Sequence, residues 1–328
     1  MNSKVKVKSA SSDRQAKQIL GSSELKTLNT RSNGKGLIQF AGHICVMVCS
    51  GYLWVTADNL LIKIPALIVY GFSFAVMFAP LHESSHRTAF AKVRLNDTVA
   101  WIAGLFSFYN SDFYRRYHKW HHRYAQVEGK DPELDDPKPS NFWEYLVELS
   151  GWNWWIGKFK SHYKVATGQL EDYFYIAEDA RDEVIRSTRL QLAVYGVAIA
   201  ISLAFGQPWF FTLWLFPLAV GQPIVRYILL AEHTGCSRDG NPLTNTRTTL
   251  TWFPLMAWNI PFHAEHHLYP SIPFHALPQA HQELKKHFEV VENGYVKVHR
   301  DIVKNVNNPF LLSWRKGLLK SVKSKRVY

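Results

Sequence analysis

Histidines in three short clusters are the residues of this chain whose types and spacing could do chemistry. The clusters are His82-x-x-x-His86, His118-x-x-His121-His122 and His263-x-x-His266-His267. Neutral imidazole is the commonest metal ligand at physiological pH, and a spacing of three or four residues puts two rings on one face of a helix. Eight imidazoles exceed the roughly four ligands that one zinc takes, so the clusters predict two metal ions. Imidazole ligation with little carboxylate or thiolate suits iron, among other transition metals.

The spacing His-x-x-His-His recurs in the second and third clusters. Adjacent helical residues diverge by roughly 100°, so the two histidines of a doublet can reach different metals of a pair. The first cluster also matches the H-E-x-x-H motif of zinc proteases. That interpretation leaves the other two clusters unexplained.

Seven further histidines lie outside these clusters. His233 ends an apolar stretch, and its position alone leaves open whether it is a ligand or a helix cap. His43 lies inside an apolar run and is expected to be a hydrogen-bonded structural residue. The others are expected at the surface or in support of the ligands: His162, His275, His281, His287 and His299.

Long apolar runs must position the clusters. Residues 37–57 and 64–81 carry no charge, and neither do residues 190–225, which Gly206-Gln207-Pro208 divides in two. A run of about 20 apolar residues crosses roughly 30 Å of hydrocarbon. The runs therefore predict four membrane-spanning helices in two hairpins, the last continuing through Arg226 toward His233. A buried soluble core is the alternative.

Two shorter apolar stretches are ambiguous. Residues 98–109 are too few to span and would form a re-entrant or interfacial segment. Residues 142–159 contain four tryptophans and predict an interfacial aromatic helix.

Composition and charge agree with a membrane protein. Among 328 residues there are 12 tryptophans, which suit membrane–water interfaces. The net charge of +12 is concentrated at the ends, with eight Lys or Arg before Gly36 and eleven after Pro278. A nucleic-acid partner is not expected, because its reader would carry basic residues interleaved with aromatics in one domain. Three cysteines give no disulfide framework.

These patterns divide the chain into three parts. Residues 1–36 are predicted to be a polar, basic and disordered arm without a cleavable signal peptide. Residues 37–287 form the membrane catalytic domain, and 288–328 a basic tail. The positive-inside rule places both termini in the cytoplasm. All three clusters and His233 then emerge on that same side.

The three clusters, their order and their placement after hairpins resemble the histidine boxes of the membrane fatty acid desaturase and hydroxylase superfamily. The third box, Trp258-Asn-Ile-Pro-Phe-His263-Ala-Glu-His266-His267-Leu-Tyr-Pro270, is especially typical. The resemblance covers roughly residues 36–287.

This resemblance implies a non-haem di-iron centre that uses molecular oxygen, in an all-α integral membrane fold of four helices under a cytosolic helical cap. About nine histidines would bind the two irons. By position they are His82, His86, His118, His121, His122, His233, His263, His266 and His267.

Two departures from the family pattern bear on the reaction. The first box has three intervening residues, where acyl-CoA desaturases often have four. Leu229 stands four residues before His233, where some relatives use an Asn to hold a metal-bound water. The choice between desaturation and hydroxylation therefore stays open.

An unactivated C–H bond is too strong for a side-chain acid or base, so a redox metal must carry the chemistry. Loss of a second, neighbouring hydrogen gives an alkene, whereas oxygen insertion gives an alcohol. The leading hypothesis is an oxygen-dependent desaturase of an aliphatic, fatty acyl or lipid-like chain. Alternatives are a hydroxylase or ketolase of a carotenoid or alkane, a desaturase of a small amino-acid-like natural product, and a non-enzymatic metal transporter.

Supporting groups and partners follow from the same hypothesis. Carboxylates near the boxes would orient the imidazoles, and the candidates are Glu83, Asp112, Glu232 and Glu265. Arginines near the boxes would bind an anionic substrate, an electron donor or phospholipid head groups: Arg87, Arg115, Arg116, Arg123, Arg238 and Arg247. The sequence has no haem-binding or dinucleotide-binding fingerprint, so a separate ferredoxin or cytochrome b5 is implied as electron donor.

Overall fold

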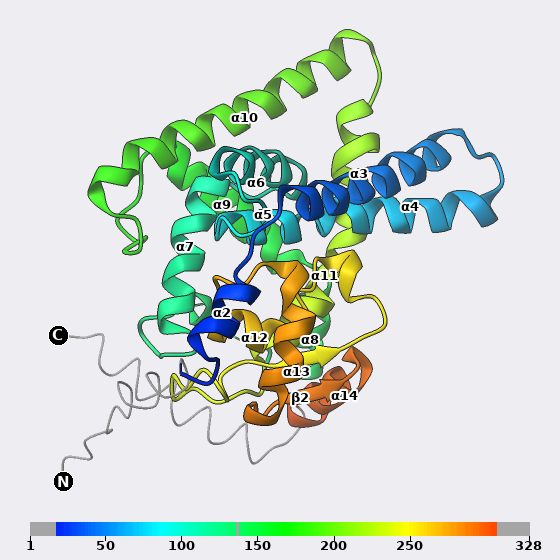
Figure 1. Cartoon of the computed structure of the whole chain (residues 1–328). Coiled ribbons are helices and arrows are strands. Elements are labelled where there is room, and N and C mark those ends of the chain that lie inside the picture. Colours follow the sequence, from blue (N-terminus) through cyan, green and yellow to red (C-terminus); the bar gives the residue numbers. More distant parts are fainter. Residues whose placement is uncertain (1–17, 136–137, 307–328) are drawn as a thin grey trace.

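The computed structural model describes residues 18–135 and 138–306, and within these its regular secondary structure is mostly helical (Figure 1). The exception is a pair of three-residue strands, β1 (Thr248–Leu250) and β2 (Val291–Asn293), which pair in parallel with Thr248 opposite Val291. The prediction of an all-α fold is therefore wrong for this small sheet, which two segments more than 40 residues apart in the sequence form beside the third box.

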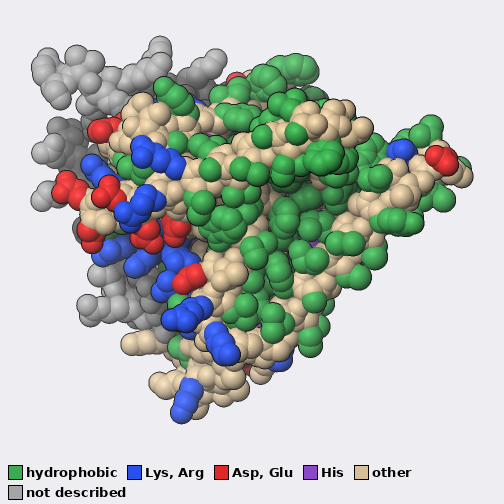
Figure 2. All heavy atoms as spheres, turned by 90° about the horizontal axis from the view of Figure 1, so that it is seen from above, with side chains coloured by type: hydrophobic (Ala, Val, Ile, Leu, Met, Phe, Trp, Pro, Cys, Tyr) green, Lys and Arg blue, Asp and Glu red, His purple; other side chains and the backbone are tan. Residues whose placement is uncertain are grey.

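Four segments are long and apolar enough to cross a membrane, as predicted. They are α3 (Asn33–Thr56), α4 (Leu60–Ala75) with α5 (Phe78–Ser85), α10 (Arg181–Ala204) with the residues before it, and α11 (Phe216–His233) with the π-helical turn η3 (Phe211–Leu215). Many of their large apolar side chains are exposed. Figure 2 shows apolar side chains spread along the projecting helices and charged ones gathered on the opposite side.

Helix α4 packs against both α3 and α11. Two glycines make the contact between α4 and α11 close: a Cβ added at Gly71 would collide with the carbonyl of Pro217, and one at Gly221 with the carbonyl of Gly71. The close approach brings α5, which continues from α4, near the end of α11. The sequence stretches that carry His82 and His233 are thereby brought together.

The two ambiguous aromatic stretches are helical. Residues 98–109 lie mostly within α6 (Val93–Ser107), which is followed by α7 (Ser111–Tyr124). Residues 142–159 form two helices, α8 (Phe142–Leu149) and α9 (Trp152–Ala166), because Gly151 takes a positive φ of 76° between them. A left-handed backbone at that point ends one helix and starts the next.

The remaining elements are short. They are α12 (His263–Leu268), α13 (Leu277–Leu284), α14 (Tyr295–Val306) and the 3-10 turns η1 (Pro132–Leu134), η2 (Glu178–Ala180), η4 (Pro254–Ala257), η5 (Phe274–Ala276) and η6 (Lys285–His287). The turn η1 contacts α7, and η2 contacts α10.

Folded structure extends beyond both predicted domain boundaries. Helix α2 (Ser22–Leu28) lies in the predicted arm, and Leu20 and Leu28 are buried in the same apolar cluster as Leu268 of α12. The prediction of a disordered arm is therefore wrong for this stretch. Helix α14 lies in the predicted tail and buries one face in the main core. Residues 1–17 and 307–328 lie outside the described residues.

Candidate metal centre

The nine predicted histidines converge from four helices that are far apart in the sequence. His82 lies in α5 and His86 caps it, and α7 contributes the second box. His233 is the last residue of α11, and α12 consists mostly of the third box. The side-chain amide oxygen of Asn110 caps α7 by accepting from the backbone N–H of Phe113, which fixes where that helix starts.

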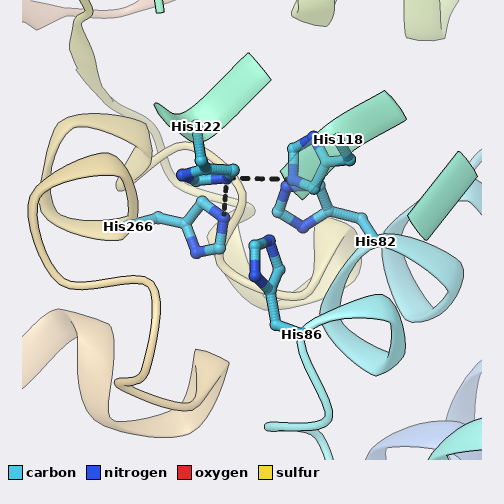
Figure 3. Close-up of side chains that lie close together, drawn as sticks. All are labelled: His82, His86, His118, His122 and His266. Carbon is cyan, nitrogen blue, oxygen red and sulfur yellow. Dashed lines mark hydrogen bonds between the residues drawn. The ribbon is translucent and has the colours of Figure 1, made fainter. Parts of the chain in front are cut away.

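Five of these histidines form one group: His82, His86, His118, His122 and His266 (Figure 3). One ring nitrogen from each lies within 4.8 Å of the others. The His122 Nε2 atom is 3.0 Å from His118 Nε2 and 3.1 Å from His266 Nε2. We call this set the five-histidine group.

His121, His233 and His267 form a second set, the three-histidine group, again with ring nitrogens within 4.8 Å of one another. The Nε2 atoms of His121 and His267 are 3.3 Å apart. His263 adjoins this group, with its Nε2 atom 3.1 Å from that of His233. Both doublets are divided between the two groups, as the angular divergence of adjacent helical residues predicted.

The two groups suit metal ions by geometry. With metal–nitrogen bonds of about 2.1 Å, neighbouring ligand nitrogens lie about 3.0 to 3.4 Å apart, which matches the pairs above. Several buried ring nitrogens have no hydrogen-bond partner among the described residues, and such atoms are costly to bury unless something binds them. In His82 they are both ring nitrogens, and in His86 the atom is Nε2, so these two rings have a nitrogen available to a metal. In His118, His122, His263 and His266 the atom is Nδ1, whereas Nε2 forms the close pairs.

Electrostatics also keep most of the rings neutral. Burial, with the nearby histidines, lowers the pKa of His86 to about 3. It lowers the pKa well below the usual value for His118, His122, His263, His266 and His267. A neutral ring keeps a lone pair for a metal. For His121, burial lowers the pKa, but the negative charges of Glu133 and Asp131 outweigh the effect of burial, so the pKa is raised.

Partners beyond the rings orient two members of the three-histidine group. The carboxylate oxygen Oδ1 of Asp131 lies 2.9 Å from His121 Nδ1, and the backbone carbonyl of Asn245 lies 2.9 Å from His233 Nδ1. Asp131 is itself held by the backbone N–H of Gln126 at 2.7 Å. Asp131 was not among the predicted site residues, because an Asp before Pro132 resembles an ordinary turn cap.

The four carboxylates that were predicted to orient ligands have different positions. Glu83 Oε1 lies 3.6 Å from His82 Nδ1 and 3.8 Å from His266 Nδ1, close to both but beyond hydrogen-bond distance. Glu232 lies 3.5 Å from His263 Nε2. Glu265 contacts no box histidine; it binds His281 Nδ1 at 2.5 Å and the Thr248 hydroxyl at 2.6 Å. For Asp112 the structure gives no contact with a box histidine.

Most of the arginines near the boxes are paired within the protein. Arg87 and Arg115 both bind Asp97. Arg247 is buried and donates to the carbonyls of Ala231 and Thr234, so it caps the end of α11. Arg116 pairs with Glu183, Arg238 with Glu128, and Arg123 lies over the ring of Tyr124.

The histidines outside the boxes mostly have structural contacts. His43 Nε2 lies 2.8 Å from the carbonyl of Ser73, as a structural residue should. His299 is buried between Tyr145 and the backbone of Tyr227. His281 supports α12 through Glu265, which fits the expected supporting role. His162 stacks on Phe108, His275 is partly exposed, and His287 is exposed.

Comparison with known proteins defines the class. Residues 59–298 match the model of the fatty acid desaturase family. Because the match covers most of the chain, the protein belongs to that family and is an oxidoreductase. The zinc protease and metal transporter hypotheses are thereby set aside.

Three relatives illustrate the similarity. The chain is 26% identical over 250 residues to the sphingolipid delta(4)-desaturase DES1 of Gallus gallus, covering 69% of this chain and 68% of that one. It is 24% identical to the sphingolipid delta(4)-desaturase/C4-monooxygenase DES2 of Homo sapiens, covering 68% and 66%. It is 24% identical to an sn-1 oleoyl-lipid 12-desaturase of Picosynechococcus, covering 69% and 70%.

Proposed function

We propose that this protein is an oxygen-dependent desaturase that introduces a double bond into a fatty acyl or lipid-like chain at two iron ions. The convergence of nine histidines into two adjoining groups is the observation that carries the proposal. Family membership and relatives named as lipid desaturases support the same reaction and substrate class.

Within this proposal the five-histidine group binds one iron, and the three-histidine group with His263 binds the other. Iron so bound would supply the one-electron chemistry with dioxygen that side chains lack. The residues of this chain have other tasks. Burial keeps the imidazoles neutral, and Asp131 and the Asn245 carbonyl hold two rings in fixed orientations.

We propose a membrane arrangement of two helical hairpins, α3 with α4 and α10 with α11, under a cytosolic helical cap. Four sufficiently apolar segments support the spans. The basic ends of the chain favour a cytoplasmic location for both termini and for the histidine boxes. Electrons would come from a separate ferredoxin or cytochrome b5-type protein, which can approach the cap from the cytoplasm.

Hydroxylation is the second candidate reaction. A human relative is named as both a desaturase and a C4-monooxygenase, so one scaffold in this family supports two outcomes. For this chain the difference would depend on which carbon is held near the metals after the first hydrogen is removed.

Mass spectrometry of lipids from a host that expresses the chain with a ferredoxin and its reductase tests the proposal. A product two mass units lighter is expected, and it should be absent with His266→Ala. The control variant is His287→Ala, which removes an exposed histidine outside both groups. A product sixteen units heavier would assign hydroxylation instead. If neither product forms while purified protein contains iron and accepts electrons, the proposed reaction on host lipids is wrong.

A further inference from the structure

A charged residue lies inside the last membrane-spanning segment. Arg226 is in α11, within the apolar segment 211–233. Ionisable residues in spans are costly and mark functional positions by default. Among the described residues no carboxylate forms an ion pair with Arg226, and its Nε atom is buried without a hydrogen-bond partner. Glu232 of the same helix lies 3.5 Å from His263 Nε2 and interacts with Arg226 only electrostatically, without an ion pair.

Other polar groups gather around Arg226. Gln222, one turn earlier, is 1% exposed, and its Oε1 atom has no hydrogen-bond partner within residues 18–135 and 138–306. Gly151 gives both side chains room, since a Cβ there would lie 3.3 Å from Gln222 Cβ. The Tyr109 hydroxyl accepts from Arg226 Nη2 at 3.4 Å, and Lys158 Nζ lies 3.4 Å from the centre of the Tyr109 ring. Two cations therefore contact the Tyr109 side chain, Arg226 at its hydroxyl and Lys158 at its ring face, and Gln222 lies one turn from Arg226 on the same helix.

Aromatic side chains connect this point to the five-histidine group. The Tyr109 ring lies 5.1 Å from that of Phe78 and 5.6 Å from that of Tyr114. Phe78 in turn lies 5.9 Å from His82, and Tyr114 stacks on His118 at 5.0 Å. The path is apolar between a cationic end and a metal-binding end. Binding sites for amphiphilic ligands have this design, with an apolar wall and a few placed polar groups.

Helix geometry sets the distance between the two ends. Arg226 precedes His233 by seven residues, which places the two on one face of α11 about 10 Å apart. A ligand anchored at Arg226 would therefore present to the metals a carbon several bonds away from its anchor. A space of about 10 Å³, room for one water, is lined by Tyr109, Tyr114 and Lys158 but not by Arg226 or Gln222. The aromatic side chains must turn to admit a chain.

We propose that Arg226, with Gln222 and Lys158, binds the oxyanion of the substrate, a carboxylate or a phosphate ester, and so sets which carbon reaches the metal centre. The proposal rests on the proposed function, which supplies an acyl substrate. Guanidinium groups match the geometry of such oxyanions and bind them through charge-assisted hydrogen bonds. An anion here would also satisfy the buried Nε of Arg226.

Equilibrium binding to the purified full-length protein in a neutral detergent tests this site without turnover or a reductant. The anionic probes are radiolabelled palmitate and dodecyl phosphate, and the neutral probes are hexadecanol and dodecanol. We expect Arg226→Gln to weaken binding of an anionic probe about tenfold or more and to leave the neutral probes unchanged. Arg226→Lys should give an intermediate loss. Arg189→Gln, which removes an exposed arginine of α10, is the matched control.

Unchanged affinity of Arg226→Gln for both anionic probes would overturn the proposal. A bilayer phospholipid is the other source of an oxyanion. If Arg226→Gln binds the probes normally but loses co-purifying phosphatidylglycerol, Arg226 binds a resident lipid and the substrate assignment is wrong. Should Arg226→Gln fail to fold, which loss of hexadecanol binding would reveal, Gln222→Leu replaces it and must weaken anionic probes selectively. Because no probe needs to react, these results are independent of whether the protein is a desaturase.

Discussion

The five-histidine group and the three-histidine group differ in what holds their rings. In the three-histidine group, His121 and His233 each contact an oxygen at 2.9 Å through Nδ1. In the five-histidine group, every member has a buried ring nitrogen that has no hydrogen-bond partner in the described part of the chain, and Glu83 lies nearby at 3.6 Å or more.

The difference shows two ways to build an imidazole site. A ring that is hydrogen-bonded on its far side is oriented before a metal arrives. Where the rings lack such bonds, metal binding depends on the number of ligands and on packing. Burial makes these rings neutral but does not fix their orientation. We therefore expect the three-histidine group to depend strongly on each ligand and its support, and the five-histidine group to tolerate single losses.

Removal of one ligand from each group should give the largest effect. His121→Ala leaves the smaller group with two members beside His263, so we expect loss of about half of the bound iron and of all detectable product. His86→Ala leaves four ligands and should retain most of the iron. Iron per protein by mass spectrometry measures both variants. Equal iron loss in the two would contradict the comparison.

Loss of a carboxylate that contacts a histidine ring should have the second largest effect, a fall in iron affinity. Asp131→Asn keeps the shape but weakens the bond to His121, so iron affinity should fall about 10- to 100-fold. Glu83→Gln should cost less than tenfold, because its contacts are longer. Competition with a chelator measures the affinities. Asp172→Asn, at an exposed ion pair with Lys164, is the control and should have no effect.

The pH dependence of the metal-free protein should separate His86 of the five-histidine group from His121, the member of the three-histidine group whose pKa is raised. A histidine with a lowered pKa, such as His86 at about 3 against 6.5, binds fewer protons folded than unfolded, so stability falls as pH falls below 6.5. The slope is at most about 1.4 kcal/mol per pH unit for each such group. His121 has a raised pKa and contributes in the opposite sense, with stability present below 6.5 and lost as pH rises through its folded pKa.

Melting temperatures between pH 7 and pH 5 measure this contrast. We expect His86→Gln to make the acid loss of stability shallower and His121→Gln to make it steeper. The same change of slope in both variants would show that Glu133 and Asp131 do not raise the pKa of His121.

The smallest effect is expected from loss of the hydrogen bond between Thr248 and Glu265, because this bond supports the helix that contributes histidines to both groups. Thr248 donates to Glu265, which lies in α12 between His263 and His266. Thr248→Val should cost about 1 kcal/mol of stability and weaken the binding of both irons to the same extent. Thermal unfolding with and without iron measures it. A selective loss of one iron would show that α12 does not couple the groups.

Much of this site was predictable from spacing. The doublets His121-His122 and His266-His267 had to diverge once they were helical, and the division of each between two groups follows from helix geometry alone. Four spans followed from charge-free runs, because hydrocarbon tolerates little else. The short sheet and the helix at residues 22–28 were not predictable, since their stability comes from packing beside the third box rather than from local pattern.

The sequence by itself determined the kinds of ligand, their spacing and the apolar helices that carry them, because these depend on neighbours within a few residues. Only the tertiary structure decided which histidines share a group, since that needs helices separated by more than a hundred residues to meet. It also selected Asp131 rather than Asp112 to hold a ligand, and it turned Arg226 toward Tyr109. Such choices depend on distances between side chains that are remote along the chain, and no local pattern encodes those distances.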